Sequence, residues 1–207
     1  TTQIYPDFAK VADQEGFKEI ASVFRKIAIA EARHRDRYLA LKRIVDFNPD
    51  IYGIVFCRTR KETQEVADLL MKDGYNADAL HGDLSQAQRD NVMNKFRIRR
   101  LKLLVATDVA ARGLDVDHLT HVINYNLPDE NEIYTHRSGR TGRAGKSGIS
   151  IVIANLKEKR KIQDIEKGES KSMASVDYFQ RKLDDKRRLT IPAELRVEFA
   201  SGVVVTR

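Results

Sequence analysis

The fold of this chain is decided by a stretch that begins Ile51-Tyr-Gly-Ile-Val-Phe-Cys57 and continues to Leu80. Its first seven residues are almost all apolar, which is typical of a strand buried on both faces of a sheet. An amphipathic helix is predicted next, over Lys61–Lys72 and closed by Gly74, and a short strand follows over Ala77–Leu80. Strands separated by helices of this length indicate a parallel sheet.

The same alternation continues along the chain. A helix is predicted over Ser85–Phe96 with Ser85 as its N-cap. Buried strands are predicted over Leu101–Thr107, Thr120–Tyr125 and Gly148–Ala154, and a polar helix over Lys157–Glu166. We therefore expect an α/β fold, a parallel sheet with helices on both faces, whose functional loops follow the carboxyl ends of the strands.

The two ends of the chain differ from this middle part. Over the first 46 residues apolar side chains recur with a helical period, and Gly16 predicts a corner between two helices. A stretch of small polar residues follows Gly168, and the remaining residues predict short strands around a turn at Asp184. We expect four parts: a helical hairpin (1–40), the α/β domain (41–167), a linker (168–175) and a β-hairpin and helix segment (176–207).

Composition narrows the function classes. The 207 residues carry a formal charge of +7, which favours a polyanionic partner. Cys57 is the sole cysteine, so a disulfide framework and a cysteine zinc site are excluded. No apolar run is long enough to span a membrane, and no signal-peptide pattern opens the chain. We expect a cytoplasmic protein without a membrane partner.

The densest chemical motif is His136-Arg-Ser-Gly-Arg-Thr-Gly-Arg143. Arginines interleaved with glycines predict a loop that approaches a phosphate closely and places guanidinium groups on its oxygens. Such an arginine finger is worth roughly 10³–10⁵ in rate in other nucleotide hydrolases. The alternative interpretation is a solvated basic loop.

A neighbouring motif imitates a nucleotide-binding loop. Gly145-Lys146-Ser147 ends like a phosphate-binding G-x-x-x-x-G-K-[ST] loop, but Arg140 stands where the first glycine is needed. The segment also leads into a predicted strand and not into a helix. No other G-K-[ST] and no D-E-A-D-like acidic box occurs in the sequence, so we expect no phosphate cradle within it.

Four motifs together resemble one family. His136–Arg143, Ala106–Asp115 and Ile54–Thr59 are similar to motifs VI, V and IV of DEAD-box RNA helicases, and His81–Asp83 with Gln86-x-x-Arg89 resembles their adjoining elements. The order and spacing match as well. Residues 32–167 thus resemble the C-terminal RecA-like domain of this family.

The resemblance implies a role for each matching residue. Arg140 and Arg143 would reach the γ-phosphate of ATP, and Asp115 would bond its ribose. Contacts to the backbone of single-stranded or duplex RNA would come from Arg58, Gly82, Thr107 and Arg112. The motif-supporting residues would be His81, Asp83, Gln86, Arg89, Asp108, His136, Arg137 and Gly139. Two alternatives stay open: Thr107 and Asp108 as strand-end caps, and His81 as a satisfied core histidine.

The resemblance also implies what the domain needs from outside. ATP with Mg²⁺ would be held by a partner N-terminal helicase lobe, so we expect the chain to be inactive in ATP hydrolysis and RNA unwinding by itself.

The flanking segments carry two further resemblances. The first 40 residues resemble the third and fourth helices of rubrerythrin-type proteins, and Glu31 and His34 form an E-x-x-H pair on one helix face, a weak candidate for a metal site. The last segment resembles one repeat of MraZ-type regulators, relatives of AbrB, through Asp184 and Arg188, with Arg187 departing from the family's glycine. DNA binding or self-association through this tail is the implied function.

Four hypotheses follow. The chain is a helicase-derived lobe that contacts RNA and completes an ATPase, a DNA-binding or oligomerising module, a metalloprotein, or an engineered or recombined chimera without selected activity.

Overall fold

The computed structural model describes residues 3–116, 118–141, 148–155, 158 and 160–162. It divides into two compact units, Thr1–Ala40 and Leu41–Arg207. Several predictions fall outside the described residues: the role of Arg143, the Gly145-Lys146-Ser147 motif, the linker, and the hairpin with Asp184, Arg187 and Arg188. Of the predicted polar helix, residues 160–162 are helical and most of the rest also lies outside.

The first unit contains helix α1 and most of helix α2, which agrees with the predicted pair of helices. Helix α1 spans Ile4–Gln14, α2 spans Lys18–Phe47, and Gly16 at the corner has a φ of +85°, a backbone conformation that favours glycine. The Phe24 ring lies 5.4 Å from that of Phe8 and 6.4 Å from that of Tyr5. These ring contacts join the two helices into a hairpin.

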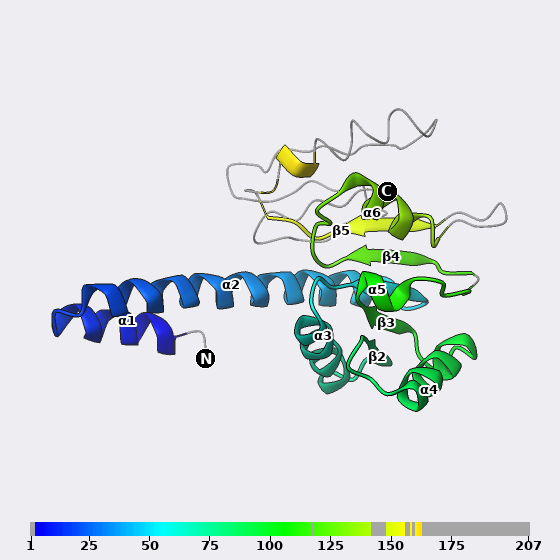
Figure 1. Cartoon of the computed structure of the whole chain (residues 1–207), viewed down its shortest axis with the longest axis horizontal. Helices are drawn as coiled ribbons and strands as arrows, with labels where there is room; N and C mark the ends of the chain where they lie inside the picture. The colour runs from blue at the N-terminus through cyan, green and yellow to red at the C-terminus, as the bar shows by residue number, and fades with distance from the viewer. Residues whose placement is uncertain (1–2, 117, 142–147, 156–157, 159, 163–207) are drawn as a thin grey trace. The chain divides into compact units, whose positions relative to one another are not determined.

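The second unit contains a five-stranded parallel sheet in the order β2-β3-β1-β4-β5 (Figure 1). The strands are β1 (Gly53–Phe56), β2 (Ala77–Leu80), β3 (Leu103–Ala106), β4 (His121–Asn124) and β5 (Ile149–Val152). Each lies inside a predicted strand. The parallel sheet predicted from the buried apolar runs is therefore confirmed.

Alternate residues of each strand point to opposite sides of the sheet, so apolar side chains lie on both faces and helices cover both. Ile54, Phe56 and Leu104 on one side pack in a core with buried residues of α4 (Gln86–Arg97) and the short helix α5 (Asp108–Ala111). Helix α3 (Arg60–Lys72) packs on β2 and β3 through a separate set of buried residues, Val66, Ala67 and Leu70.

Helices α4 and α3 both begin at a capping residue, and the cap at Ser85 was predicted. The Ser85 hydroxyl accepts a hydrogen bond from the Gln88 backbone N–H, and the Gln88 side chain accepts one from the Ser85 backbone N–H, a complete capping box. Thr59 caps α3 in the same way by accepting from the backbone N–H of Glu62.

The prediction of a loop over His136–Arg143 is wrong in its first part. Helix α6 spans Asn131–Ser138 and contains His136 and Arg137 in its last turn, with Gly139 as C-cap. A cation in the last turn of a helix interacts favourably with its dipole, so this placement suits Arg137.

Gly53 allows two strands to approach closely. A Cβ atom at this position would lie 2.5 Å from the backbone oxygen of His121 on β4. The apolar pattern that predicted β1 does not reveal this constraint, because it depends on the strand that lies alongside.

Candidate functional site

The chemically distinctive side chains follow the carboxyl ends of the parallel strands. Arg58 comes after β1, His81 after β2, Thr107 after β3 and Asn126 after β4. Because these ends lie at one edge of the sheet, segments far apart in the sequence are brought together there. We call this the carboxyl edge.

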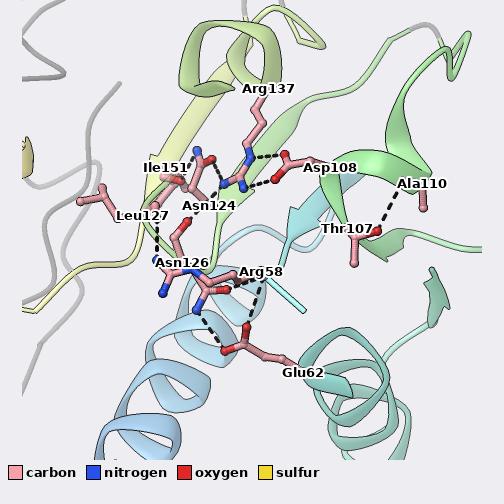
Figure 2. A network of polar contacts seen from close by, with 10 residues as sticks. All are labelled: Arg58, Glu62, Thr107, Asp108, Ala110, Asn124, Asn126, Leu127, Arg137 and Ile151. Atoms are coloured by element: carbon pink, nitrogen blue, oxygen red, sulfur yellow. Dashed lines mark hydrogen bonds and ion pairs between the residues drawn. The ribbon is translucent and has the colours of Figure 1, made fainter. Parts of the chain in front are cut away.

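Arg137 is buried at this edge and holds three segments together (Figure 2). Its Nε and Nη2 atoms donate to the two carboxylate oxygens of Asp108, each at 2.6 Å. Its Nη1 atom donates to Asn124 Oδ1 at 2.9 Å and to the Asn126 backbone oxygen at 3.2 Å. The guanidinium also lies over the Phe56 ring, 4.9 Å from the centroid. Only 4% of Arg137 is exposed, so it supports the edge and is not available to a ligand.

A second polar group fixes the segment that follows β1. Asn126 Oδ1 accepts the backbone N–H of Arg58 at 2.9 Å, while Asn126 Nδ2 donates to Glu62 Oε1 at 3.0 Å (Figure 2). Asn126 is 4% exposed. The position of the Arg58 backbone is therefore set by a buried side chain from beyond β4.

The Arg58 side chain itself is half exposed. Its Nη2 atom donates to the Leu127 backbone oxygen at 3.2 Å and lies 3.6 Å from Asp129 Oδ1. Asp129 also accepts from Lys161 Nζ at 2.6 Å, and this hydrogen bond, together with the charge of Arg58, lowers the pKa of the Asp129 carboxyl. The side chain of Arg58 is 52% exposed, so about half of it is open to a ligand.

His81 is a positioned core histidine, as one alternative proposed. Its Nδ1 atom accepts the backbone N–H of Asp83 at 3.3 Å, and the Nε2–H then donates to Gln64 Oε1 at 2.9 Å. Asp83 pairs with Arg60. At Gly82 an added Cβ would meet only the Arg60 side chain, at 3.6 Å, so the fold itself leaves room there.

The segment after β3 has a capping role and an exposed cation. The Thr107 hydroxyl accepts from the Ala110 backbone N–H at 3.3 Å, which starts α5, and Thr107 is 8% exposed. The capping alternative for Thr107 is confirmed. Arg112 at the end of α5 is exposed, and Gly113 after it has a φ of +72°.

Arg140 lies next to the segment that holds Asp115. Its Nη1 atom donates to the Leu114 backbone oxygen at 2.9 Å, and Asp115 is exposed beside this contact. Thr141 donates from Oγ1 to the Leu119 backbone oxygen at 2.7 Å. The segment after α6 is thus joined to the segment after α5 at two points.

The other predicted support residues contribute less here. Gln86 donates to Asp90 Oδ1 at 2.8 Å along α4, and Arg89 lies on the same helix. His136 is exposed on α6.

This constellation matches a known family. The model of the helicase conserved C-terminal domain covers residues 36–145, which include the segments that form the carboxyl edge. The chain belongs to the helicase C-terminal domain family.

Relatives place this helicase domain among the DEAD-box proteins. A probable ATP-dependent RNA helicase of Methanocaldococcus jannaschii is 47% identical over 137 residues, 66% of this chain and 37% of the relative. The structure of the E. coli DEAD-box protein SrmB bound to regulator of ribonuclease activity A matches with a TM-score of 0.61 and 32% identity, covering 65% of this chain and 79% of that one.

A third match is a structure with ligands. S. cerevisiae Dbp5 bound to RNA and ADP BeF3 matches with a TM-score of 0.60 and 31% identity, over 65% of this chain and 36% of that one. The chain spans about a third of the length of two of these relatives, 37% of the M. jannaschii protein and 36% of the Dbp5 chain. It corresponds to the C-terminal lobe of a DEAD-box helicase, as the motifs predicted.

The family model of rubrerythrin matches residues 1–42. Glu31 and His34 lie on α2, and both are exposed. Within the described residues, no group of three or more His, Cys, Asp or Glu side chains is arranged to hold a metal ion. Among those residues no helix is long and apolar enough to cross a bilayer.

The sequence analysis did not identify three polar residues of the carboxyl edge: Asn124, Asn126 and Glu62. A signal for one of them was present, because Asn124 lies inside the segment Thr120–Tyr125 that was predicted as a buried strand. Polar side chains at such positions need partners. The identity of those partners depends on which strands and helices lie side by side.

Proposed function

We propose that this chain acts as the C-terminal lobe of an ATP-dependent DEAD-box RNA helicase. In this proposal the carboxyl edge contacts the sugar–phosphate backbone of RNA through the exposed Arg58 and Arg112 and through the open backbone at Gly82. Thr107 holds that surface by capping α5. Such contacts position a strand without reading its bases.

The observation that carries the proposal is the contact of Arg140 with the segment of Asp115. It brings the proposed phosphate-facing arginine next to the proposed ribose-facing carboxylate at one edge of the domain. ATP with Mg²⁺ would be held by an N-terminal helicase lobe, and Arg140 with Arg143 would neutralise charge that develops on the transferred phosphoryl group. The chain alone is therefore proposed to hydrolyse no ATP. Its proposed location is the cytoplasm.

The proposal is tested with RNA titrations and an ATPase assay. The purified chain should bind single-stranded RNA weakly, with affinity that falls as salt rises, and should hydrolyse no ATP. Adding a separately expressed N-terminal lobe of a DEAD-box relative should restore turnover, and Arg140→Ala should reduce it by roughly 10³-fold or more. ATP turnover by the chain alone that Arg143→Ala abolishes would overturn the proposal.

Gly82→Ala tests the RNA contact without disturbing the fold. The fold has room for the added methyl group, so stability should stay unchanged. RNA binding should weaken because the methyl group stands between the backbone and the phosphate. Unchanged RNA affinity in both Gly82→Ala and Arg58→Ala would remove the carboxyl edge as the RNA contact.

A second candidate concerns the ends of the chain. The rubrerythrin match (1–42) and the helicase match (36–145) overlap inside the single helix α2, which supports the interpretation of the chain as a chimera. DNA binding or self-association through the MraZ-like tail rests on Asp184 and Arg188 in the sequence. Light scattering that shows a monomer, together with DNA affinity unchanged by Arg188→Ala, would rule out both tail functions.

A further inference from the structure

A cluster of positive charge lies at the opposite edge of the sheet from the proposed RNA contacts. Five basic residues occur within eight positions where α4 ends and β3 begins: Lys95, Arg97, Arg99, Arg100 and Lys102. We call this cluster the basic turn. No acidic residue occurs between Asp90 and Asp108, so the charge is not neutralised within this part of the chain.

The basic turn has a defined backbone. The N–H of Arg100 donates to the Lys95 oxygen and that of Arg99 to the Phe96 oxygen, both at 2.9 Å, which is the Schellman pattern at a helix end. Arg99 has a φ of +58°, the left-handed conformation that usually takes glycine there. The Tyr52 hydroxyl donates to the Phe96 oxygen at 3.0 Å, so the turn is joined to the residue that precedes β1.

The cations of the basic turn make few contacts within the fold. Arg99 lies over the Tyr52 ring, 4.7 Å from its centroid, and Lys102 donates to the Pro49 oxygen at 2.8 Å. None of the five forms an ion pair with any described residue. A favourable interaction with the α4 dipole accounts for Lys95 and Arg97 only, because the other three follow the helix.

We propose that the basic turn is a second RNA-backbone contact, separate from the carboxyl edge. Lys102 and Thr107 flank β3 and are five residues apart, so the two surfaces lie about 17 Å from each other along the strand. RNA held at the carboxyl edge would reach the basic turn only through a flanking segment. The inference rests on the proposed function only in taking RNA as the polyanion.

The composition of the basic turn favours phosphate over a protein partner. Three of its five cations are arginines, whose planar fork suits phosphate oxygens. A protein interface would need an apolar centre, and Ile98 is the one exposed apolar side chain of the turn itself, at 53%.

The test compares two variants of equal net charge. The turn variant carries Lys95→Gln, Arg97→Gln, Arg99→Gly and Arg100→Gln. The control carries four substitutions to Gln at exposed lysines elsewhere: Lys10, Lys18, Lys26 and Lys72. Arg99→Gly relieves the left-handed backbone, which offsets the lost contact with the Tyr52 ring and the lost dipole interactions of Lys95 and Arg97, so thermal unfolding of the turn variant should occur close to the wild-type temperature.

Binding of a labelled oligouridylate of about 20 nucleotides is measured by fluorescence anisotropy at several salt concentrations. Each single-strand phosphate contact is worth about fivefold in affinity at about 0.1 M salt. We expect the turn variant to lose about 25- to 125-fold and its salt slope to fall by about 1.4–2.1, as for two or three contacts. The control variant should lose much less.

Two results would overturn the proposal. One is an affinity and salt slope of the turn variant equal to those of the control. The RNA affinity of Arg58→Ala, measured in parallel, tests the carboxyl-edge proposal separately. The other is loss of binding to a polyglutamate peptide while RNA affinity stays unchanged, which would assign the basic turn to an acidic protein.

Discussion

Arg137→Ala is the substitution that tests most directly how the carboxyl edge is held together. It removes every hydrogen bond that joins α6 to Asp108 on α5 and to Asn124 at the end of β4. It also removes the guanidinium from the Phe56 ring. The side chain contacts no proposed ligand, so its effect should appear in stability before it appears in binding.

The magnitude follows from what is left behind. Asn124 is fully buried, so its Oδ1 atom without a donor costs about 1–3 kcal/mol. The Asp108 side chain is 35% exposed and regains water, so its share is below the 3–5 kcal/mol of a fully buried pair. Lost contact with Phe56 adds about 0.5–1 kcal/mol. We expect a loss of about 3 kcal/mol in the free energy of unfolding.

The assay is urea unfolding followed by far-UV circular dichroism, with Arg137→Lys and Arg58→Ala as comparisons. Lysine keeps the charge but lacks the planar fork, so it should lose about half as much as alanine. The Arg58 side chain is 52% exposed, and its removal should change stability by about 0.5 kcal/mol or less. An Arg137→Ala variant within about 0.5 kcal/mol of the wild type would refute the assigned role.

Three further perturbations probe the sheet and the basic turn. Gly53→Ala places a methyl group 2.5 Å from the His121 backbone oxygen, and we expect a loss of about 2–4 kcal/mol and a lower midpoint of thermal unfolding; an unchanged midpoint would contradict the close strand approach. Burial lowers the pKa of His121 from its ordinary value near 6.5, so unfolding takes up a proton and stability should fall as pH drops below about 6.5, by at most about 1.4 kcal/mol per pH unit. His121→Gln should remove that part of the pH dependence, and an identical profile in the variant would exclude His121 as its source. Tyr52→Phe deletes the hydrogen bond to the Phe96 oxygen and should lower the free energy of urea unfolding by about 1 kcal/mol. An unchanged free energy of unfolding would show that this hydrogen bond does not stabilise the basic turn.

Apolar patterning predicted the strands of this domain well because it depends on a local property. A strand buried on both faces needs a continuous apolar run, and each of the five runs contains an observed strand. The caps at Ser85 and the corner at Gly16 were equally predictable, since their partners lie within a few residues. Helix α6 was missed because its last residues belong to the motif rich in glycine and arginine, which resembles a loop, and α5 was missed because its four residues are too few to show a helical period.

The chemistry of the carboxyl edge was predictable only in part. The family resemblance assigned Arg58 to RNA, Arg140 to ATP and Arg137 to the support of the motif, but residue type and spacing do not show how each side chain is placed. The fold separates them: Arg137 is buried among acceptors, Arg58 is half exposed, and Arg140 is bonded to the Leu114 oxygen.

The sequence by itself determined the class of fold, the order of its elements and the family, because apolar periodicity, caps and motif spacing are local properties of the chain. Only the tertiary structure decided how Arg137 supports the edge and how much of Arg58 can meet a ligand. Those roles depend on burial and on partners up to 69 residues away, as between Arg58 and Leu127. Parallel strands joined by helices bring such distant residues to one edge, and no local pattern records which neighbours they meet there.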